Sequence, residues 1–539
     1  MSKNIVIFCD GTWNSPADEE FGIPSVTNVR LLYRACQDFA ESGGRQVVWY
    51  QSGIGSQGNG FRRSFEGATG WGMGQAIKRG YATIAKHYYP GDKIYLFGFS
   101  RGAFAARSIA GMIRQMGLID NPNTENVAKA YEYYEGNRFE YKEKPRQTGY
   151  SPVGKEIENP CAPGNVRIHF IGVWDTVGSL GFSFWGWSFN LRFFQNAFHD
   201  ISPNSITDHV YQALAMDEIR TSFMPSLWEY PKQIAGKPVE PAARWIEQAW
   251  FRGVHSDIGG GYSERGLSDI ALKWMLDKAV EKGLVLRKNA LTTDDDPDAE
   301  RRKHSSLALR PTSRIHRSYQ GPLWTSVGGW PRWFPPLSRH ISTDARGYLH
   351  ESVFERERLC RESGSSEIQM RTLAPGESWS VEVRADQLWN FTGFILEAGA
   401  TYQMAAGGFW QDGNGPLVGP EGEHSNEVAP AKRLAIIRQG RRAPRHPWMQ
   451  LMGIVNYPRE WPWRERRWYE ALHYLFVEDP LQLVREIFPI GCQTMRTIGP
   501  NQTGILWAFA NDWWKRYANN TGSVTLTVRR LAEGELIGP

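Results

Sequence analysis

The sequence predicts two domains: an α/β domain with a doubly wound parallel sheet over residues 1–370, and an all-β sandwich over residues 371–539. Three observations predict this division. Buried-strand patterns alternate with helical patterns in the first part of the chain. Beyond about residue 372, short strand-like runs are separated by turn signals and show few helical periods. A chain of 539 residues is also too long for one hydrophobic core.

The composition is that of an ordinary globular protein, with 22% charged and 41% hydrophobic residues. A net charge of +5 is too small and too diffuse to indicate nucleic-acid binding. Five cysteines without a C-x-x-C pair argue against a zinc site or a disulfide framework, and fit a reducing cytoplasm. The sequence contains no run of 18 apolar residues, the length that would predict a membrane-spanning helix, and the N-terminus lacks a signal-peptide pattern. We therefore expect cytoplasmic synthesis and, for any export, a route that needs no signal peptide.

The first elements follow the βα pattern. Asn4–Cys9 (NIVIFC) reads as a fully buried strand of a parallel sheet, and it ends in the polar turn DGT. Such turns lie at the carboxyl edge of α/β sheets, where active-site loops gather. A helix over Val26–Phe39, a strand over Gln46–Tyr50 and helical spacing from Ile77 to Tyr88 follow.

The next strand leads into the motif on which the functional interpretation depends. Lys93–Phe99 is rich in β-formers, and Gly98, Ser100 and Gly102 complete a G-x-S-x-G motif. A helical pattern follows and closes at Gly117. A strand, this motif and a helix are typical of a nucleophile elbow, which lifts a serine oxygen clear of the sheet. An ordinary tight βα turn is the alternative.

Two later strands end in the other residues that a serine nucleophile needs. Val166–Trp174 ends at Asp175, and Gln248–Val254 ends at His255. The helix after His255 is expected to begin with Ser268 as its N-cap.

Ser100, Asp175 and His255 are therefore the candidate catalytic triad, in the chain order of α/β-hydrolases. A structural role for His255 is the alternative. Asp257 competes for the place of the acid, but a residue so near His255 in the same loop more readily braces that loop. The oxyanion hole is predicted from the backbone N–H of Arg101 and of the Gly11 and Thr12 turn. No metal is expected in the chemistry, and no cysteine has a comparable placement.

Residues 181–198 (GFSFWGWSFNLRFFQNAF) carry eight Phe and Trp side chains beside the predicted active site. A lid or a surface for acyl chains and plain core packing are both open interpretations of this segment.

Five blocks in order resemble a known family: IVIFCDGTWN, YLFGFSRGAFAAR, FIGVWDTVGSLG, HVYQALAMDEIRTSF and FRGVHSDIGGGYSERGLSDIALKWM. Over roughly residues 3–355 the sequence resembles the α/β-hydrolase domain of the type VI secretion lipase effectors of the first family. The resemblance implies that Ser100, Asp175 and His255 are the triad of a phospholipase A. It also implies delivery with a secretion-spike protein into rival bacteria, to the periplasm or membrane, and an immunity protein that protects the producer.

The tail has a second resemblance, carried by WSVEVRADQLWNFTGFILEAGATYQMAAGG, GPEGEHS and AFANDWWKRYANNTGSVTLTV. Across about residues 379–530 it is similar to the soluble galactophilic calcium-dependent bacterial lectin. In that lectin an Asp followed seven residues later by Asn-Asn holds Ca²⁺ and a galactose, and Asp512, Asn519 and Asn520 reproduce this spacing. The resemblance therefore implies a Ca²⁺ site and a glycan partner. A polar hairpin turn is the alternative interpretation.

The sequence thus predicts a serine phospholipase A that acts on membrane glycerophospholipids. Two other functions stay open: an esterase for small or carbohydrate esters, and a glycan- or partner-binding protein with a vestigial hydrolase. An insertion with six arginines and lysines between 432 and 445 and the run WPWR at 461–464 suits an anionic headgroup interface or a solvated surface.

Overall fold

The computed structural model describes most of the chain. The described residues are 2–11, 19–20, 23–53, 71–140, 165–177, 206–220, 223, 225–228, 233–234, 237–238, 246–288, 290–291, 307–316, 332, 347–365, 367–423, 442–443, 445–456, 487–512, 517–532 and 534–535.

The first part of the chain builds one seven-stranded sheet in which every pairing is parallel. The strand order is β11-β10-β7-β6-β5-β1-β4. The strands are β1 (Asn4–Cys9), β4 (Gln46–Gln51), β5 (Lys93–Phe99), β6 (Ile168–Trp174), β7 (Thr207–Ala215), β10 (Ile246–Phe251) and β11 (Tyr348–Leu349). The predicted α/β fold with a parallel sheet is confirmed. Because the strands are parallel, their carboxyl ends share one edge.

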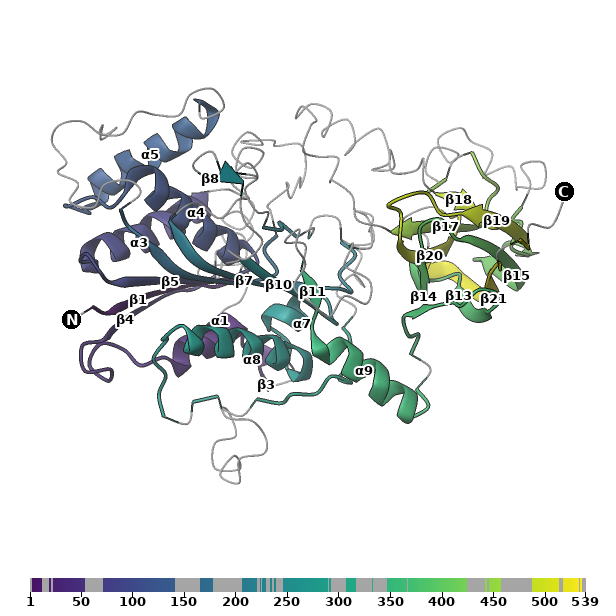
Figure 1. Cartoon of the computed structure of the whole chain (residues 1–539), viewed down its shortest axis with the longest axis horizontal. Helices are drawn as coiled ribbons and strands as arrows, with labels where there is room; N and C mark the ends of the chain where they lie inside the picture. The colour runs from purple at the N-terminus through teal and green to yellow at the C-terminus, as the bar shows by residue number, and fades with distance from the viewer. Residues whose placement is uncertain are drawn as a thin grey trace. The chain divides into compact units, whose positions relative to one another are not determined.

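Helices cover both faces of this sheet (Figure 1). One core cluster joins the sheet to α3 (Trp71–His87), α4 (Arg101–Met116) and α5 (Thr124–Glu140). The other joins it to α1 (Asn28–Ala35) and α8 (Gly266–Glu281). Burial on both faces explains why the strands are nearly continuous apolar runs. The remaining helices of the described part are α7 (His255–Gly259) and α9 (Glu351–Glu362).

Two sequence expectations need correction. Ser268 is not the N-cap of α8, because the helix already begins at Gly266. The Asp269 N–H bonds the carbonyl oxygen of Arg265, and the two side chains form an ion pair, so the first turn closes earlier. The central strand β7 was also missed. Its apolar pattern is interrupted by Gln212, which is fully buried.

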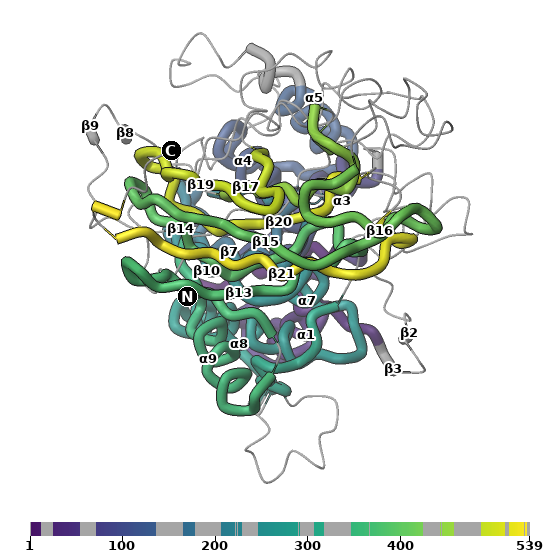
Figure 2. The backbone as a smooth tube through the Cα atoms, turned by 90° about the vertical axis from the view of Figure 1, so that its right-hand side faces the viewer, coloured from purple at the N-terminus to yellow at the C-terminus, as the bar shows by residue number. Residues whose placement is uncertain are grey.

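The predicted all-β region forms two five-stranded sheets, ordered β12-β14-β20-β17-β18 and β13-β21-β15-β16, with β19 pairing β15. Figure 2 shows β13, β21 and β15 side by side. Apolar side chains of both sheets share one core. The strands are β12 (Arg371–Thr372), β13 (Ser378–Arg384), β14 (Asn390–Leu396), β15 (Thr401–Asp412), β16 (Leu417–Val418), β17 (Leu451–Asn456), β18 (Phe488–Pro489), β19 (Gln493–Thr497), β20 (Gly504–Ala510) and β21 (Asn520–Arg530).

The chain divides into two compact units. The first comprises Met1–Glu218, Ser222–Arg317 and Ser338–Arg356, and the second Ile219–Thr221, Ser318–Leu337 and Glu357–Pro539. The main division therefore falls within α9, some way before the boundary expected at residue 370.

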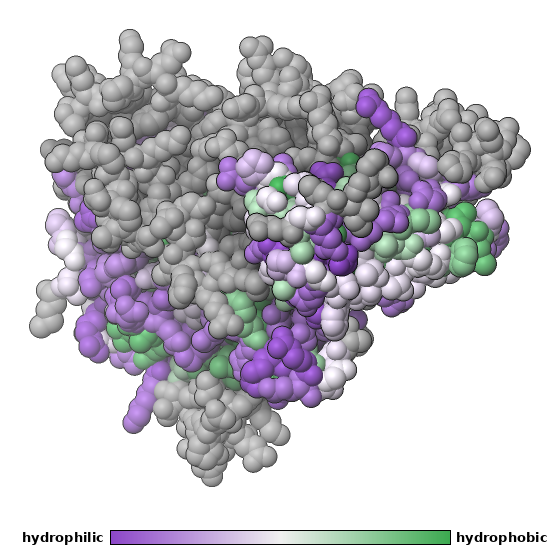
Figure 3. Space-filling model, turned by 45° about the vertical axis from the view of Figure 1, so that its right-hand side comes forward, coloured by the Kyte–Doolittle hydropathy of each residue, from purple (hydrophilic) through white to green (hydrophobic). Residues whose placement is uncertain are grey.

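On the face in Figure 3 the described surface is mainly hydrophilic, with hydrophobic side chains in small groups. Phe409 and Leu417 are among the exposed large apolar residues. Among the described helices none has the length and apolarity that crossing a membrane requires.

Candidate active site

The G-x-S-x-G motif forms a sharp turn between β5 and α4. Ser100 has φ 57° and ψ −123°, a conformation that L-residues adopt only under strain, and α4 begins at the next residue. The two motif glycines are sterically required. A Cβ on Gly98 would lie 2.5 Å from the Gly102 carbonyl oxygen, and one on Gly102 would lie 2.1 Å from the Cys9 carbonyl oxygen. The turn therefore has the sharp, glycine-flanked geometry that a nucleophile elbow requires, and it packs directly against the end of β1.

Asp175 and His255 form a buried pair at the same edge of the sheet. The His255 Nδ1 lies 2.5 Å from the Asp175 Oδ2, and the two residues are 4% and 0% exposed. The other carboxylate oxygen accepts the backbone N–H of Ala215 at 3.1 Å. Asp175 follows β6 with φ 41°, and the Ser100 N–H donates to the Trp174 carbonyl oxygen at 3.1 Å. The nucleophile candidate is thus tied to the residue that precedes the acid.

Two aromatic rings enclose the imidazole of His255. The Phe99 ring lies 4.6 Å from it between ring centres, tilted by 33°, and the Phe223 ring lies 4.9 Å away and nearly perpendicular, at 77°. Since Phe99 immediately precedes Ser100, its ring connects the elbow to the histidine. Gly259 in α7 makes room for this ring, because a Cβ there would approach it to 2.0 Å.

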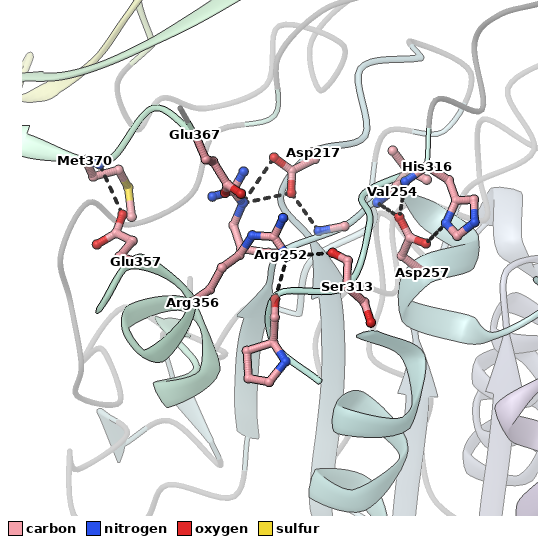
Figure 4. A network of polar contacts seen from close by, with 12 residues as sticks. Asp217, Arg252, Val254, Asp257, Ser313, His316, Arg356, Glu357, Glu367 and Met370 are labelled. Atoms are coloured by element: carbon pink, nitrogen blue, oxygen red, sulfur yellow. Dashed lines mark hydrogen bonds and ion pairs between the residues drawn. The ribbon is translucent and has the colours of Figure 1, made fainter. Parts of the chain in front are cut away.

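Three further carboxylates brace the segment that carries His255 at the start of α7, and Figure 4 draws two of them, Asp257 and Asp217. The third, Glu218, accepts the backbone N–H of His255 at 3.3 Å. Asp257 accepts the backbone N–H of Val254 at 3.0 Å and contacts the His316 Nδ1 at 2.6 Å. Asp217 accepts the backbone N–H of Gly253 at 2.6 Å. Asp257 thus bonds the backbone of Val254 and the side chain of His316, and the acid in contact with His255 is Asp175.

Asp10 organises the turn after β1 next to the elbow. Its carboxylate accepts the Tyr50 hydroxyl at 2.5 Å, the Thr27 hydroxyl at 2.8 Å and the Gly11 N–H at 2.7 Å. Burial raises the pKa of Asp10 to about 6, although these three hydrogen bonds act to lower it.

The Gly11 bond bears on the predicted oxyanion hole. Since the Gly11 N–H points to the Asp10 carboxylate, it is not directed at a substrate oxygen in this structure. Arg101 supplies the first backbone N–H of α4, and the first four N–H groups of a helix have no acceptor within the helix.

Thr12 lies outside the described residues, as do residues 181–198, the basic residues from 432 to 441 and the WPWR run at 461–464. Arg442 is described and is fully buried: its Nη1 donates to the Tyr517 hydroxyl at 3.0 Å, and its guanidinium lies 3.9 Å from the centre of the Trp389 ring. The expected headgroup interface or solvated surface therefore does not include Arg442.

Chemically, the arrangement suits transfer of a proton from a serine to a histidine. A proton on Nδ1 of His255 would face the Asp175 carboxylate, and Nε2 would then be the ring nitrogen that can act as a base. A carboxylate, an imidazole and a strained serine lie at the ends of β6, β10 and β5. Sequence reasoning missed the two rings around His255 and the Asp257–His316 pair, since each contact joins residues far apart in the chain or without a motif.

The candidate Ca²⁺ residues of the second unit lie close together but do not all converge. Asn520 Nδ2 donates to Asp512 Oδ2 at 2.9 Å and to the Ala385 carbonyl oxygen at 3.2 Å. Its buried Oδ1 has no hydrogen-bond partner among the described residues. Asn519 Nδ2 instead donates to Asp412 at 2.6 Å. Asp512 and Asn520 thus fit an oxygen-binding cation, whereas the Asn519 side chain points elsewhere.

Clusters of side chains that commonly bind metals give no independent support for an ion. Within the described part of the chain, no group of three or more His, Cys, Asp and Glu residues is placed to hold an ion.

The parallel sheet, the nucleophile elbow and the buried Asp–His pair at one sheet edge define a hydrolase-like α/β domain. A model of the family described as "T6SS, Phospholipase effector Tle1-like, catalytic domain" matches residues 3–278, which include all three triad candidates. The chain belongs to this family of type VI secretion phospholipase effectors.

One sequence relative comes from yeast. An uncharacterized protein of Saccharomyces cerevisiae is 32% identical over 236 residues, which cover 41% of this chain. The match covers 32% of that protein, so the chain spans about a third of the length of this relative.

Solved structures show only distant likeness. A crystal structure of an uncharacterized protein from Pseudomonas aeruginosa is 18% identical, covers 53% of this chain and 46% of that one, and has a TM-score of 0.34. The Tle1 effector bound to the VgrG spike of the type 6 secretion system is 21% identical over 48% of this chain and 51% of that one, with a TM-score of 0.27. The EclA N-terminal domain, a PllA-like lectin, is 22% identical over 28% of this chain and 95% of that one, with a TM-score of 0.17.

Proposed function

We propose that the protein is a serine phospholipase A that hydrolyses acyl esters of membrane glycerophospholipids. The observation that carries the proposal is the buried Asp175–His255 pair beside the strained Ser100, within the region that matches the phospholipase family. A structural histidine can also have a carboxylate on its Nδ1, as His316 does, so the strained conformation of Ser100 at the adjoining strand end is the feature that favours catalysis.

In the first half of the reaction, the Ser100 oxygen attacks the ester carbonyl and its proton passes to Nε2 of His255. The Arg101 N–H donates to the oxyanion of the tetrahedral intermediate. The bond to the leaving alcohol then breaks, and the alcohol takes the proton from Nε2. The products of this half-reaction are a lysophospholipid and an acylated Ser100.

In the second half, water attacks the acyl-enzyme and gives its proton to the same Nε2. The fatty acid leaves as the Ser100 oxygen recovers that proton. Asp175 stays ionised throughout and stabilises the imidazolium that forms twice in the cycle. No metal takes part in either half.

For the second unit we propose a docking function. The family places the chain in type VI secretion, so the proposed partners are a spike protein for delivery and an immunity protein in the producing cell. The proposed destination is the periplasm or membrane of a target bacterium. Asp512 and Asn520 would hold a Ca²⁺ ion there, and such an ion would supply a positively charged contact for sugar hydroxyls.

Covalent labelling tests the nucleophile. A fluorophosphonate probe phosphonylates serines that a neighbouring base activates. We expect mass spectrometry of the labelled protein to find the adduct on Ser100, with labelling lost in His255→Ala. An adduct on another serine, or equal labelling of the His255→Ala protein, would contradict the assignment.

A further inference from the structure

The further inference concerns the half-buried ring of Phe223 beside His255, and it rests on the proposed function. Of the two rings around the imidazole, Phe99 is 1% exposed and belongs to the packed elbow. Phe223 is only partly buried, so its ring is the one of the pair that a bound substrate can contact.

The segment that follows Phe223 is held firmly against the sheet. The Ser226 N–H donates to the Thr176 carbonyl oxygen at 2.8 Å, and Pro225 forms a bridge with Val177. Pro225–Trp228 therefore runs beside the end of β6, directly after the acid.

Two buried glutamines of the sheet complete this attachment. The side-chain amide of Gln248 accepts the Trp228 N–H at 2.9 Å and donates to the Trp228 carbonyl oxygen at 3.1 Å, as a neighbouring strand would. Gln212 donates to Gln248 at 2.9 Å and to the Ser226 carbonyl oxygen at 3.1 Å. Thr176 donates its hydroxyl to the Gln212 side chain at 2.7 Å, so the polar groups of the pair are satisfied despite full burial.

Arg107 of α4 fixes the same segment from the helix side. Its Nη1 donates to the Ser226 carbonyl oxygen at 2.7 Å, and its guanidinium stacks on the Trp228 ring at 3.8 Å. Buried amides that bond both one another and the backbone of this segment hold the segment in one conformation. The position of Phe223, two residues earlier, is thereby set relative to His255.

The proposed reaction indicates which part of the substrate lies near Phe223. Asp175 occupies Nδ1 of His255, so the leaving alcohol must approach the imidazole at Nε2 to receive its proton. The group that departs therefore passes close to the rings that enclose this imidazole. We propose that Phe223 is a specificity-determining residue for the leaving group and selects esters whose alcohol carries a hydrocarbon chain, as a lysophospholipid does.

Two ester series separate this role from others. In the first series the acyl group is butyryl and the alcohol lengthens from ethanol to decanol. In the second the leaving group is 4-nitrophenol and the acyl chain lengthens. We expect Phe223→Ala to lose about tenfold or more in kcat/KM for decyl relative to ethyl butyrate, the scale of a lost apolar contact in a pocket. The acyl-chain profile should stay that of the wild type.

Control variants make the result specific. Phe223→Leu keeps an apolar side chain and should retain most of the preference. Gln248→Leu removes both bonds to Trp228 and should weaken the same preference through the loosened segment. Thermal unfolding shows which variants fold, and Phe223→Gln, which fills similar space with a polar side chain and should also lose the preference, replaces Phe223→Ala if that protein does not fold.

The outcomes are distinguishable. An equal loss on every ester would overturn the proposal and make Phe223 a residue that merely holds His255. A changed acyl-chain profile with an unchanged alcohol profile would also overturn it and place Phe223 on the acyl side. If the wild type cleaves no ester, or if Ser100→Ala cleaves the esters as fast as the wild type, the proposed function is overturned instead.

Discussion

Replacing Asp175 by Asn keeps a side chain of the same size in place but changes which ring nitrogen of neutral His255 carries the proton. The Ala215 N–H points at Oδ1 of Asp175, so the amide oxygen of the new Asn must stay there. Its NH₂ group then faces Nδ1 of His255, which has to accept rather than donate. The neutral imidazole therefore carries its proton on Nε2 and cannot take one from Ser100.

The magnitude follows from that exchange. In serine proteases the same change leaves the geometry intact and lowers kcat by about 10⁴, which corresponds to ~5.5 kcal/mol of transition-state stabilisation. We expect a loss of similar size in fatty-acid release at pH 7.5, with thermal stability nearly unchanged because the buried contacts are kept in number.

Asp257→Asn is the matched control. Its Oδ2 accepts the backbone N–H groups of Val254 and His316, and the amide oxygen can keep that role. The remaining NH₂ faces His316, not His255, so we expect kcat within about tenfold of the wild type. A large loss in Asp257→Asn together with near-normal activity in Asp175→Asn would refute the assignment of the acid.

Three other outcomes are expected. Gly102→Ala forces a Cβ to 2.1 Å from the Cys9 carbonyl oxygen, so calorimetry should show a melting temperature lowered by several degrees, from overpacking of ~1–3 kcal/mol. Gly407→Ala, with nothing within 4 Å of the new Cβ, should leave it unchanged. Asp10 has its pKa raised from 3.8 to about 6, so its buried charge costs up to ~3 kcal/mol above pH 6, and that cost disappears as the pH falls toward 4. Asp10→Asn should therefore raise the melting temperature at pH 8 and change it little at pH 4, and equal shifts would contradict this. Millimolar Ca²⁺ should raise the melting temperature of the second unit in the wild type but not in Asp512→Ala, whereas an equal rise in both would count against the site.

Features encoded locally were the ones that the sequence could predict. The elbow is a strand and a helix joined at Ser100 within one continuous five-residue motif, and Gly98 and Gly102 mark positions where no Cβ fits. Strand ends in a parallel sheet share an edge, so Asp175 and His255 could be placed near Ser100 before any contact was known.

Features that depend on contacts across the fold could not be read in this way. Gln212 interrupts the apolar run of β7. Its side chain can be buried because it donates hydrogen bonds to Gln248 and to the Ser226 carbonyl oxygen. Asn519 follows the spacing of a known Ca²⁺ site, yet its amide binds Asp412 at the end of β15. The ring of Phe223 belongs to no motif at all.

The central claim is that Ser100 is the nucleophile of a phospholipase. Fatty-acid release from vesicles of phosphatidylethanolamine and phosphatidylglycerol, by the wild type and by Ser100→Ala with and without a chelator, tests it most directly. We expect release by the wild type in both conditions and none by Ser100→Ala. No release from these vesicles by a folded wild type that still cleaves short esters, or equal release by the mutant, would contradict the account.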